Sequence, residues 1–101
     1  MNKNFLKQAQ QLQARLAKVQ QDLEEETIEV TSGGGAIKIS MTGKLVVQSI
    51  VIDPEAVDPD DVTTLEDLVL TAVNEALQQA QEMASNRMGA ITGGMRIPGL
   101  M

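Results

Sequence analysis

Few side chains of this sequence could carry out covalent or acid–base chemistry. The 101 residues contain no Cys and no His, which excludes a thiolate nucleophile, a zinc–cysteine site and the usual general base. Phe5 is the only aromatic residue, so the stacking platforms on which RNA-binding sheets and OB-folds hold bases are excluded as well. The composition therefore predicts a protein that is not an enzyme and that uses no cofactor.

The segments that could hold a metal ion or a phosphate are better explained as local structure. The acidic segment from Asp53 to Asp61 lacks the spacing and the central Gly of an EF-hand, and its carboxylates suit the start of a helix. Residues 32–35 (Ser-Gly-Gly-Gly) precede a strand pattern, and Gly43-Lys44 lacks the other positions of a P-loop. We interpret both as turns and predict no metal site.

The remaining feature that could bind a ligand is charge, and the basic and acidic residues are segregated along the chain. The net charge is −6, from eight basic and fourteen acidic residues. Residues 1–20 nevertheless contain four basic residues and no acid, whereas residues 21–30 contain five acids and residues 53–67 contain seven acids, both without a base. Because Lys and Arg bind phosphates independently of sequence, the N-terminal segment is the candidate surface for a polyanion.

A long helix must position these basic residues. Residues 2–26 contain no Gly and no Pro, and their apolar side chains recur at alternating spacings of four and three: Phe5, Ala9, Leu12, Leu16, Val19 and Leu23. This 3.5-residue repeat predicts one helix with a narrow apolar seam. The seam could pack on another helix of the same chain or pair with the same helix of a second copy.

The centre of the chain has the period of β-strands. Residues 27–31, 36–41 and 44–52 alternate in polarity around turns at residues 32–35 and at Thr42-Gly43, which predicts a three-stranded antiparallel meander. In the third strand we expect Val46, Ile50 and Ile52 on one face, and Leu45, Val47 and Val51 on the other. One layer of helices covers only one face, so we predict a homodimer with Leu45, Val47 and Val51 at its interface.

A second helix, residues 62–88, has the wide apolar stripe of a core-facing helix. The sequence thus predicts an α+β fold of the order α-β-β-β-α, with one domain over residues 1–88 and a flexible glycine-rich tail over residues 89–101. No segment resembles a membrane span or a signal peptide, so we expect a cytoplasmic protein.

The lengths of the predicted elements point to a protruding helix. A helix of about 25 residues spans roughly 37 Å, whereas a strand of six or seven residues spans roughly 20 Å. Part of the first helix must therefore extend beyond the sheet, and that part carries the basic residues. In a dimer, two such helices would form a clamp for duplex DNA.

Several local strings resemble the YbaB/EbfC family of nucleoid-associated proteins, and the resemblance covers nearly the whole chain. They are the Gln-, Leu- and Lys-rich first helix, residues 46–54 ending in Ile-Asp-Pro, residues 65–68 (Leu-Glu-Asp-Leu), residues 74–76 (Asn-Glu-Ala), and residues 88–95 with Pro98-Gly99. The glycine-rich ending after a helix is the most specific of these. The resemblance implies a homodimer with paired sheets and protruding helices, located at the nucleoid.

The resemblance also implies binding to duplex DNA with little sequence preference, a role in nucleoid organisation or gene regulation, and a link to recombination or replication proteins. Under this hypothesis the residues that contact phosphates are Lys3, Lys7, Arg15, Lys18, Arg87 and Arg96. The alternative is a protein-interaction adaptor that docks a recombination or transcription factor and touches DNA indirectly or not at all. The negative net charge favours this alternative, and the segregation of charge favours DNA binding.

Overall fold

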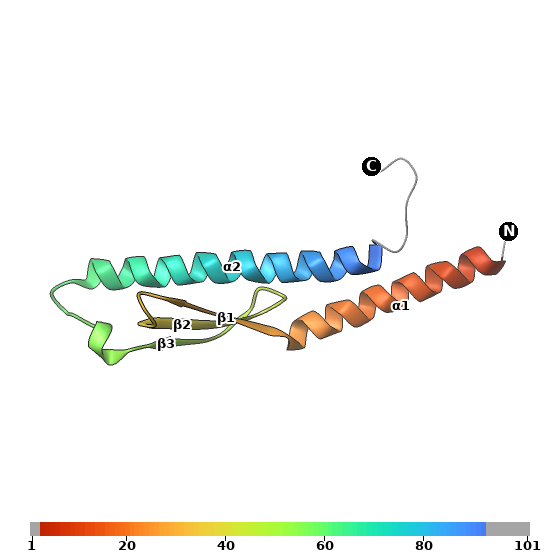
Figure 1. Cartoon of the computed structure of the whole chain (residues 1–101). Coiled ribbons are helices and arrows are strands. Elements are labelled where there is room, and N and C mark those ends of the chain that lie inside the picture. The colour runs from red at the N-terminus through yellow and green to blue at the C-terminus, as the bar shows by residue number, and fades with distance from the viewer. Residues whose placement is uncertain (1–2, 93–101) are drawn as a thin grey trace, which may run out of the picture.

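The chain forms one three-stranded sheet covered on one face by a long helix, while a second long helix extends away from the sheet (Figure 1). The computed structural model describes residues 3–92. Its elements follow the predicted α-β-β-β-α order, which is confirmed: α1 (Lys3–Glu25), β1 (Thr27–Ser32), β2 (Ile37–Thr42), β3 (Val47–Ile52), the 3₁₀ turn η1 (Pro54–Ala56) and α2 (Val62–Thr92). The sheet is antiparallel in the order β1-β2-β3.

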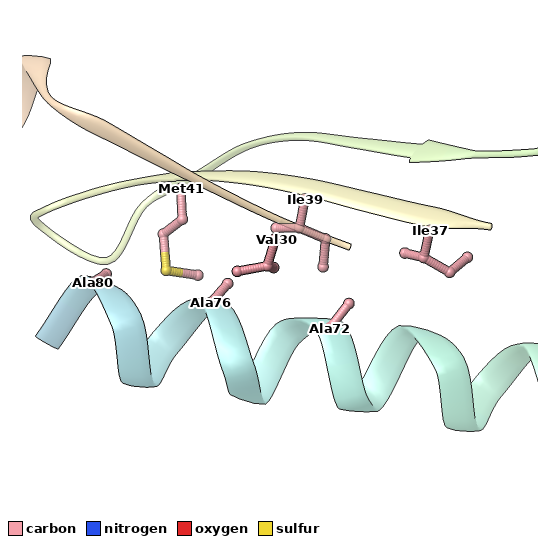
Figure 2. Packing of buried hydrophobic residues seen from close by; sticks show 7 residues of the cluster. All are labelled: Val30, Ile37, Ile39, Met41, Ala72, Ala76 and Ala80. Carbon is pink, nitrogen blue, oxygen red and sulfur yellow. The ribbon is translucent and has the colours of Figure 1, made fainter. Parts of the chain in front are cut away.

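The core lies between α2 and the first two strands. Val30 of β1 and Ile39 of β2 are paired in register, and both are buried against the helix. The helix presents three buried alanines, Ala72, Ala76 and Ala80, which line up beneath the strands in Figure 2. Because alanines recur every fourth residue on one helix face, the backbone of α2 can approach the sheet closely and leave room for the larger strand side chains.

The acidic connection between β3 and α2 supplies caps, as predicted. The Asp53 carboxylate accepts a hydrogen bond from the Glu55 N–H at 3.0 Å. Asp61, which precedes α2, accepts from the Thr64 N–H at 3.3 Å and from its hydroxyl at 2.7 Å. These bonds satisfy N–H groups that have no partner within the helix.

The turn between β2 and β3 differs from the predicted two-residue turn at Thr42-Gly43. Residues 43–45 form a three-residue loop: the Leu45 N–H donates to the Thr42 carbonyl at 3.0 Å, and the Thr42 N–H donates to the Val46 carbonyl at 2.9 Å. Leu45 has φ +65°, the left-handed conformation that ends such loops. The predicted position of Leu45 within a strand is therefore wrong, and β3 begins at Val47.

A bulge also overturns the predicted face of Val47 in β3. Ser40 pairs with Ser49, but Met41 pairs with Val47, so Gln48 has no partner in the ladder. Because directly paired side chains project to the same face, Val47 lies on the α2 side with Ile50, not opposite it. Val51 pairs with the exposed Lys38 and keeps its predicted place on the outer face.

The second helix is longer than predicted. It continues through Gly89 to Thr92, because a single Gly costs a helix only about 1 kcal/mol. The first four residues of the predicted tail, 89–92, are thus the end of α2, and residues 93–101 lie outside the described part of the chain.

Candidate nucleic-acid interface

The N-terminal half of α1 protrudes from the body, which confirms the predicted overhang. In Figure 1, α1 runs past the C-terminal end of α2, and the molecule measures 70 × 27 × 16 Å along its principal axes. Residues 3–11 are all exposed, and Leu23 is the one buried residue of α1. We call residues 3–18 the basic arm.

Contacts at the C-terminal end of α1 set the direction of the arm. The Gly43 N–H donates to the Glu26 carbonyl at 3.0 Å, which joins the β2–β3 loop to the end of α1. On the other side, the Arg87 guanidinium of α2 forms an ion pair with the Glu26 carboxylate. Lys44 of the loop donates to the Gln20 side chain of α1. These contacts, together with buried Leu23, form what we call the arm base.

The basic side chains of the arm lie away from its apolar seam. At about 100° per residue, Lys3, Lys7 and Lys18 fall within about 60° of one another, on the side of the helix opposite Leu12 and Leu23. Arg15 lies on the flank between them, and all four basic residues are exposed. From Lys3 to Lys18 the row spans about 22 Å at 1.5 Å per residue.

The basic residues predicted to contact phosphates differ in whether they form an ion pair within the chain. Lys3, Lys7 and Arg15 form no ion pair with any residue of the described chain. The Lys18 ammonium lies 2.9 Å from the Asp22 carboxylate, and this hydrogen bond raises the pKa of Lys18 above its usual value. Lys18 is therefore charged at neutral pH, but its charge is partly compensated.

Of the two predicted arginines outside α1, the structure describes only Arg87. Arg87 lies at the arm base, where it is paired with Glu26, and Arg96 lies outside the described residues. Lys44 is an exposed cation at the arm base, which the sequence assigned to a turn and to the start of the third strand. Its contact with Gln20 joins residues 24 positions apart, so no local pattern could have indicated it.

A second candidate surface is apolar and runs along β3 and the adjoining flank of α2. The Ser32 hydroxyl of β1 donates to the Leu68 carbonyl at 2.7 Å, which places the Leu68 flank of α2 over β1. The opposite flank of α2 forms an open groove of about 430 Å³, which is lined by Leu65, Glu66, Val69, Leu70 and Val73 of this helix. We call this groove, together with β3, the β3–α2 surface.

The β3–α2 surface exposes several large apolar side chains. Ile50 is 47% exposed, Val51 57% and Leu70 59%. The outer face of β1 and β2 is polar instead, and there Lys38 and Glu29 form an ion pair at 3.5 Å. The uncovered apolar side chains are thus concentrated at the β3 edge.

Two other kinds of site are absent from the part of the chain that the structure describes. No group of three or more acidic side chains within residues 3–92 is arranged to hold a metal ion. No helix in this range is both long enough and apolar enough to cross a bilayer.

Comparison with known proteins agrees with this geometry. The model of the YbaB/EbfC DNA-binding family matches residues 1–95. A nucleoid-associated protein of Ruminiclostridium cellulolyticum is 56% identical over 98 residues, which cover 96% of this chain and 85% of that protein. One of Desulforamulus reducens is 54% identical over 100 residues, covering 99% of this chain and 94% of that protein.

A solved structure shows the same fold. The uncharacterized protein HP0035 from Helicobacter pylori superposes with a TM-score of 0.79 and 16% identity, over 92% of this chain and 99% of that one. The family match spans both long helices and the whole sheet, and the relatives share more than half of their aligned residues with this chain. The chain belongs to the YbaB/EbfC DNA-binding family.

Proposed function

We propose that this chain forms a homodimer that binds duplex DNA with little sequence preference through its two basic arms, and that it acts in nucleoid organisation or gene regulation. The observation that carries the proposal is the protruding arm, whose Lys3, Lys7 and Arg15 are exposed and unpaired within the described chain. The family and the names of the relatives support it.

The arm suits a phosphate backbone better than it suits base edges. Its cations are spread along about 22 Å of one helix face and are separated mainly by Gln, Leu and Ala. Lys and Arg in such a row neutralise phosphates and carry no sequence information. The acids begin at Asp22, so we expect DNA to contact the arm and to be repelled from the arm base.

The β3–α2 surface supports the dimer. Leu45, Val47 and Val51, the interface residues expected from sequence, are all exposed: Leu45 in the β2–β3 loop, Val47 on the α2 side and Val51 on the outer face. Ile50, on the α2 side of β3, and Leu70 of α2 are exposed as well. Burying these side chains against a second copy would remove their apolar area from water. We propose a two-fold axis along the direction of the strands, because this axis places both arms at the same end of the dimer.

The first test is DNA binding as a function of salt. If four to eight phosphates are neutralised per dimer, log affinity falls with log salt at a slope of roughly −4 to −7. A mobility-shift titration on random-sequence duplexes measures this slope. The absence of binding even at low salt would contradict the proposal.

A charge-matched pair of variants tests the arm. Replacing Lys7, Arg15 and Lys18 with Gln removes three positive charges, and we expect it to weaken binding by at least about tenfold at low salt and to flatten the salt slope. The control adds three negative charges on the face of α2 that points away from the sheet: Thr71→Glu, Gln78→Glu and Ser85→Glu. Equal losses in the two variants would show that net charge, not the arm, governs binding.

The overall acidity of the chain favours a second candidate, an adaptor that docks a recombination, replication or transcription protein. A pull-down with and without nuclease separates the two functions. Partners lost on nuclease treatment support direct DNA binding, whereas partners retained without DNA support the adaptor.

A further inference from the structure

The end of the basic arm carries an apolar pair that the protein leaves uncovered. Phe5 is 63% exposed and Leu6 is 49% exposed, and they are the two large exposed hydrophobic residues of α1. Every neighbour from Lys3 to Gln11 is exposed as well. The fold of the described chain therefore does not use these two side chains for packing.

The position of Leu6 is not explained by the apolar seam of the helix. Phe5 lies on the seam with Leu12 and Leu16, but Leu6 is turned about 100° from Phe5, towards the side of Lys3. A helix–helix contact through a 3.5-residue seam needs no apolar side chain at that place. Phe5 and Leu6 together make the end of the arm broader and more apolar than the rest of the seam.

Charge indicates what kind of partner meets this pair. Lys3 and Lys7 lie two residues before Phe5 and one residue after Leu6, and both are exposed and unpaired within the described chain. The apolar pair is thus flanked by cations, and the helix has no acid before Asp22. Such a surface is complementary to one that is apolar inside and anionic outside. Stacked bases behind a row of phosphates have this character.

We propose that Phe5 and Leu6 insert as a wedge between base pairs, unstack one base step and bend the duplex, while Lys3 and Lys7 hold the adjacent phosphates. This inference rests on the proposed DNA-binding function. Inserted Phe and Leu side chains kink DNA in this way in proteins that bind the minor groove. The loss of stacking offsets most of the gain from burying the wedge, so the pair changes the shape of the DNA more than its affinity.

The experiment compares three proteins at saturation on a short duplex that accommodates one dimer. They are the natural chain, the double variant Phe5→Ala with Leu6→Ala, and a control on the same arm, Gln10→Ala with Gln13→Ala, whose side chains are also exposed. The fluorescence of 2-aminopurine, placed in turn at successive positions, reports unstacking. Energy transfer between dyes at the two ends reports bending, and a salt titration reports phosphate contacts.

For the natural chain and the control, we expect a several-fold rise in 2-aminopurine fluorescence at one or more positions and a shortened end-to-end distance. The double variant should lose both signals, while its affinity stays within about tenfold and its salt slope is unchanged. Binding by the natural chain without unstacking, or unstacking that survives in the double variant, would overturn the wedge and leave the DNA-binding function standing.

Sedimentation without DNA checks the competing role of the pair. If the double variant loses self-association, and the unstacking signal is absent from the natural chain, Phe5 and Leu6 join arm to arm and the wedge is overturned. If the natural chain binds no DNA at all, the proposed function fails, and the wedge fails with it.

Discussion

At the scale of single residues, the basic arm divides into free and compensated cations. Lys7 and Arg15 have no ion pair within the described chain, whereas Lys18 is held by Asp22 at 2.9 Å. An exposed ion pair of this kind contributes little to stability. If the arm binds DNA as proposed, a phosphate has to compete with Asp22 for the Lys18 ammonium.

Asp22→Asn tests this competition. Releasing Lys18 and removing one negative charge should raise DNA affinity by about two- to tenfold at low salt and steepen the salt slope by up to about 1 per arm. Mobility shifts at several salt concentrations measure both quantities. The control Asp60→Asn changes the net charge equally at an exposed residue between η1 and α2, and an equal gain there would show that only overall charge matters.

At the scale of elements, the contact between the β2–β3 loop and α1 determines where the arm points. A Cβ atom at Gly43 would lie 2.7 Å from the Leu23 Cδ2 and 3.0 Å from the Leu23 backbone oxygen. The loop can approach α1 this closely only with Gly. The Gly43 N–H also donates a hydrogen bond to the Glu26 carbonyl. Gly43 therefore both packs against α1 and forms a polar contact with its C-terminal end.

We therefore expect Gly43→Ala to lower the free energy of unfolding by about 1–3 kcal/mol, because the added methyl group overpacks the arm base. The matched variant Gly89→Ala lies in helix α2, where an added Cβ meets no atom within 4 Å. It should raise the free energy of unfolding by up to about 1 kcal/mol. Urea denaturation measures both changes, and equal effects of the two substitutions would contradict the role of Gly43.

At the scale of the whole molecule, a sheet packed on one helix leaves its last strand without cover. All six residues of β3 are exposed, although four of them are Val or Ile. The outer face of β1 and β2 is polar, whereas the β3–α2 surface leaves apolar side chains exposed. This difference is why we propose that the dimer interface lies along β3 and the neighbouring flank of α2.

Leu70→Asp should therefore produce a folded monomer, because a carboxylate in the interface would lose its hydration. Leu70 is 59% exposed in the single chain, so the substitution should change the stability of the chain itself by no more than about 0.5 kcal/mol. Analytical ultracentrifugation measures the mass, and Val57→Asp, at an exposed site in the loop after η1, serves as the control. A Leu70→Asp protein that stays dimeric would exclude this part of the β3–α2 surface.

The amino-acid sequence by itself determined the type and order of the elements and the location of the charge. The 3.5-residue seam of α1, the alternating strands and the alanine stripe of α2 are local periodicities, and each follows from how one element exposes its side chains. The protrusion of the arm followed from lengths alone, since a helix of 23 residues cannot be covered by strands of six.

Only the tertiary structure decided the faces of β3 and the partners of the cations. The bulge at Gln48 moved Val47 to the α2 side. A one-residue shift of this kind moves side chains to the opposite face of the sheet, and the pattern of polarity along the sequence does not reveal it. The pairing of Arg87 with Glu26 and of Lys44 with Gln20 joins residues 61 and 24 positions apart. Such contacts form because the packed elements bring distant residues together, and periodicity along the chain carries no information about them.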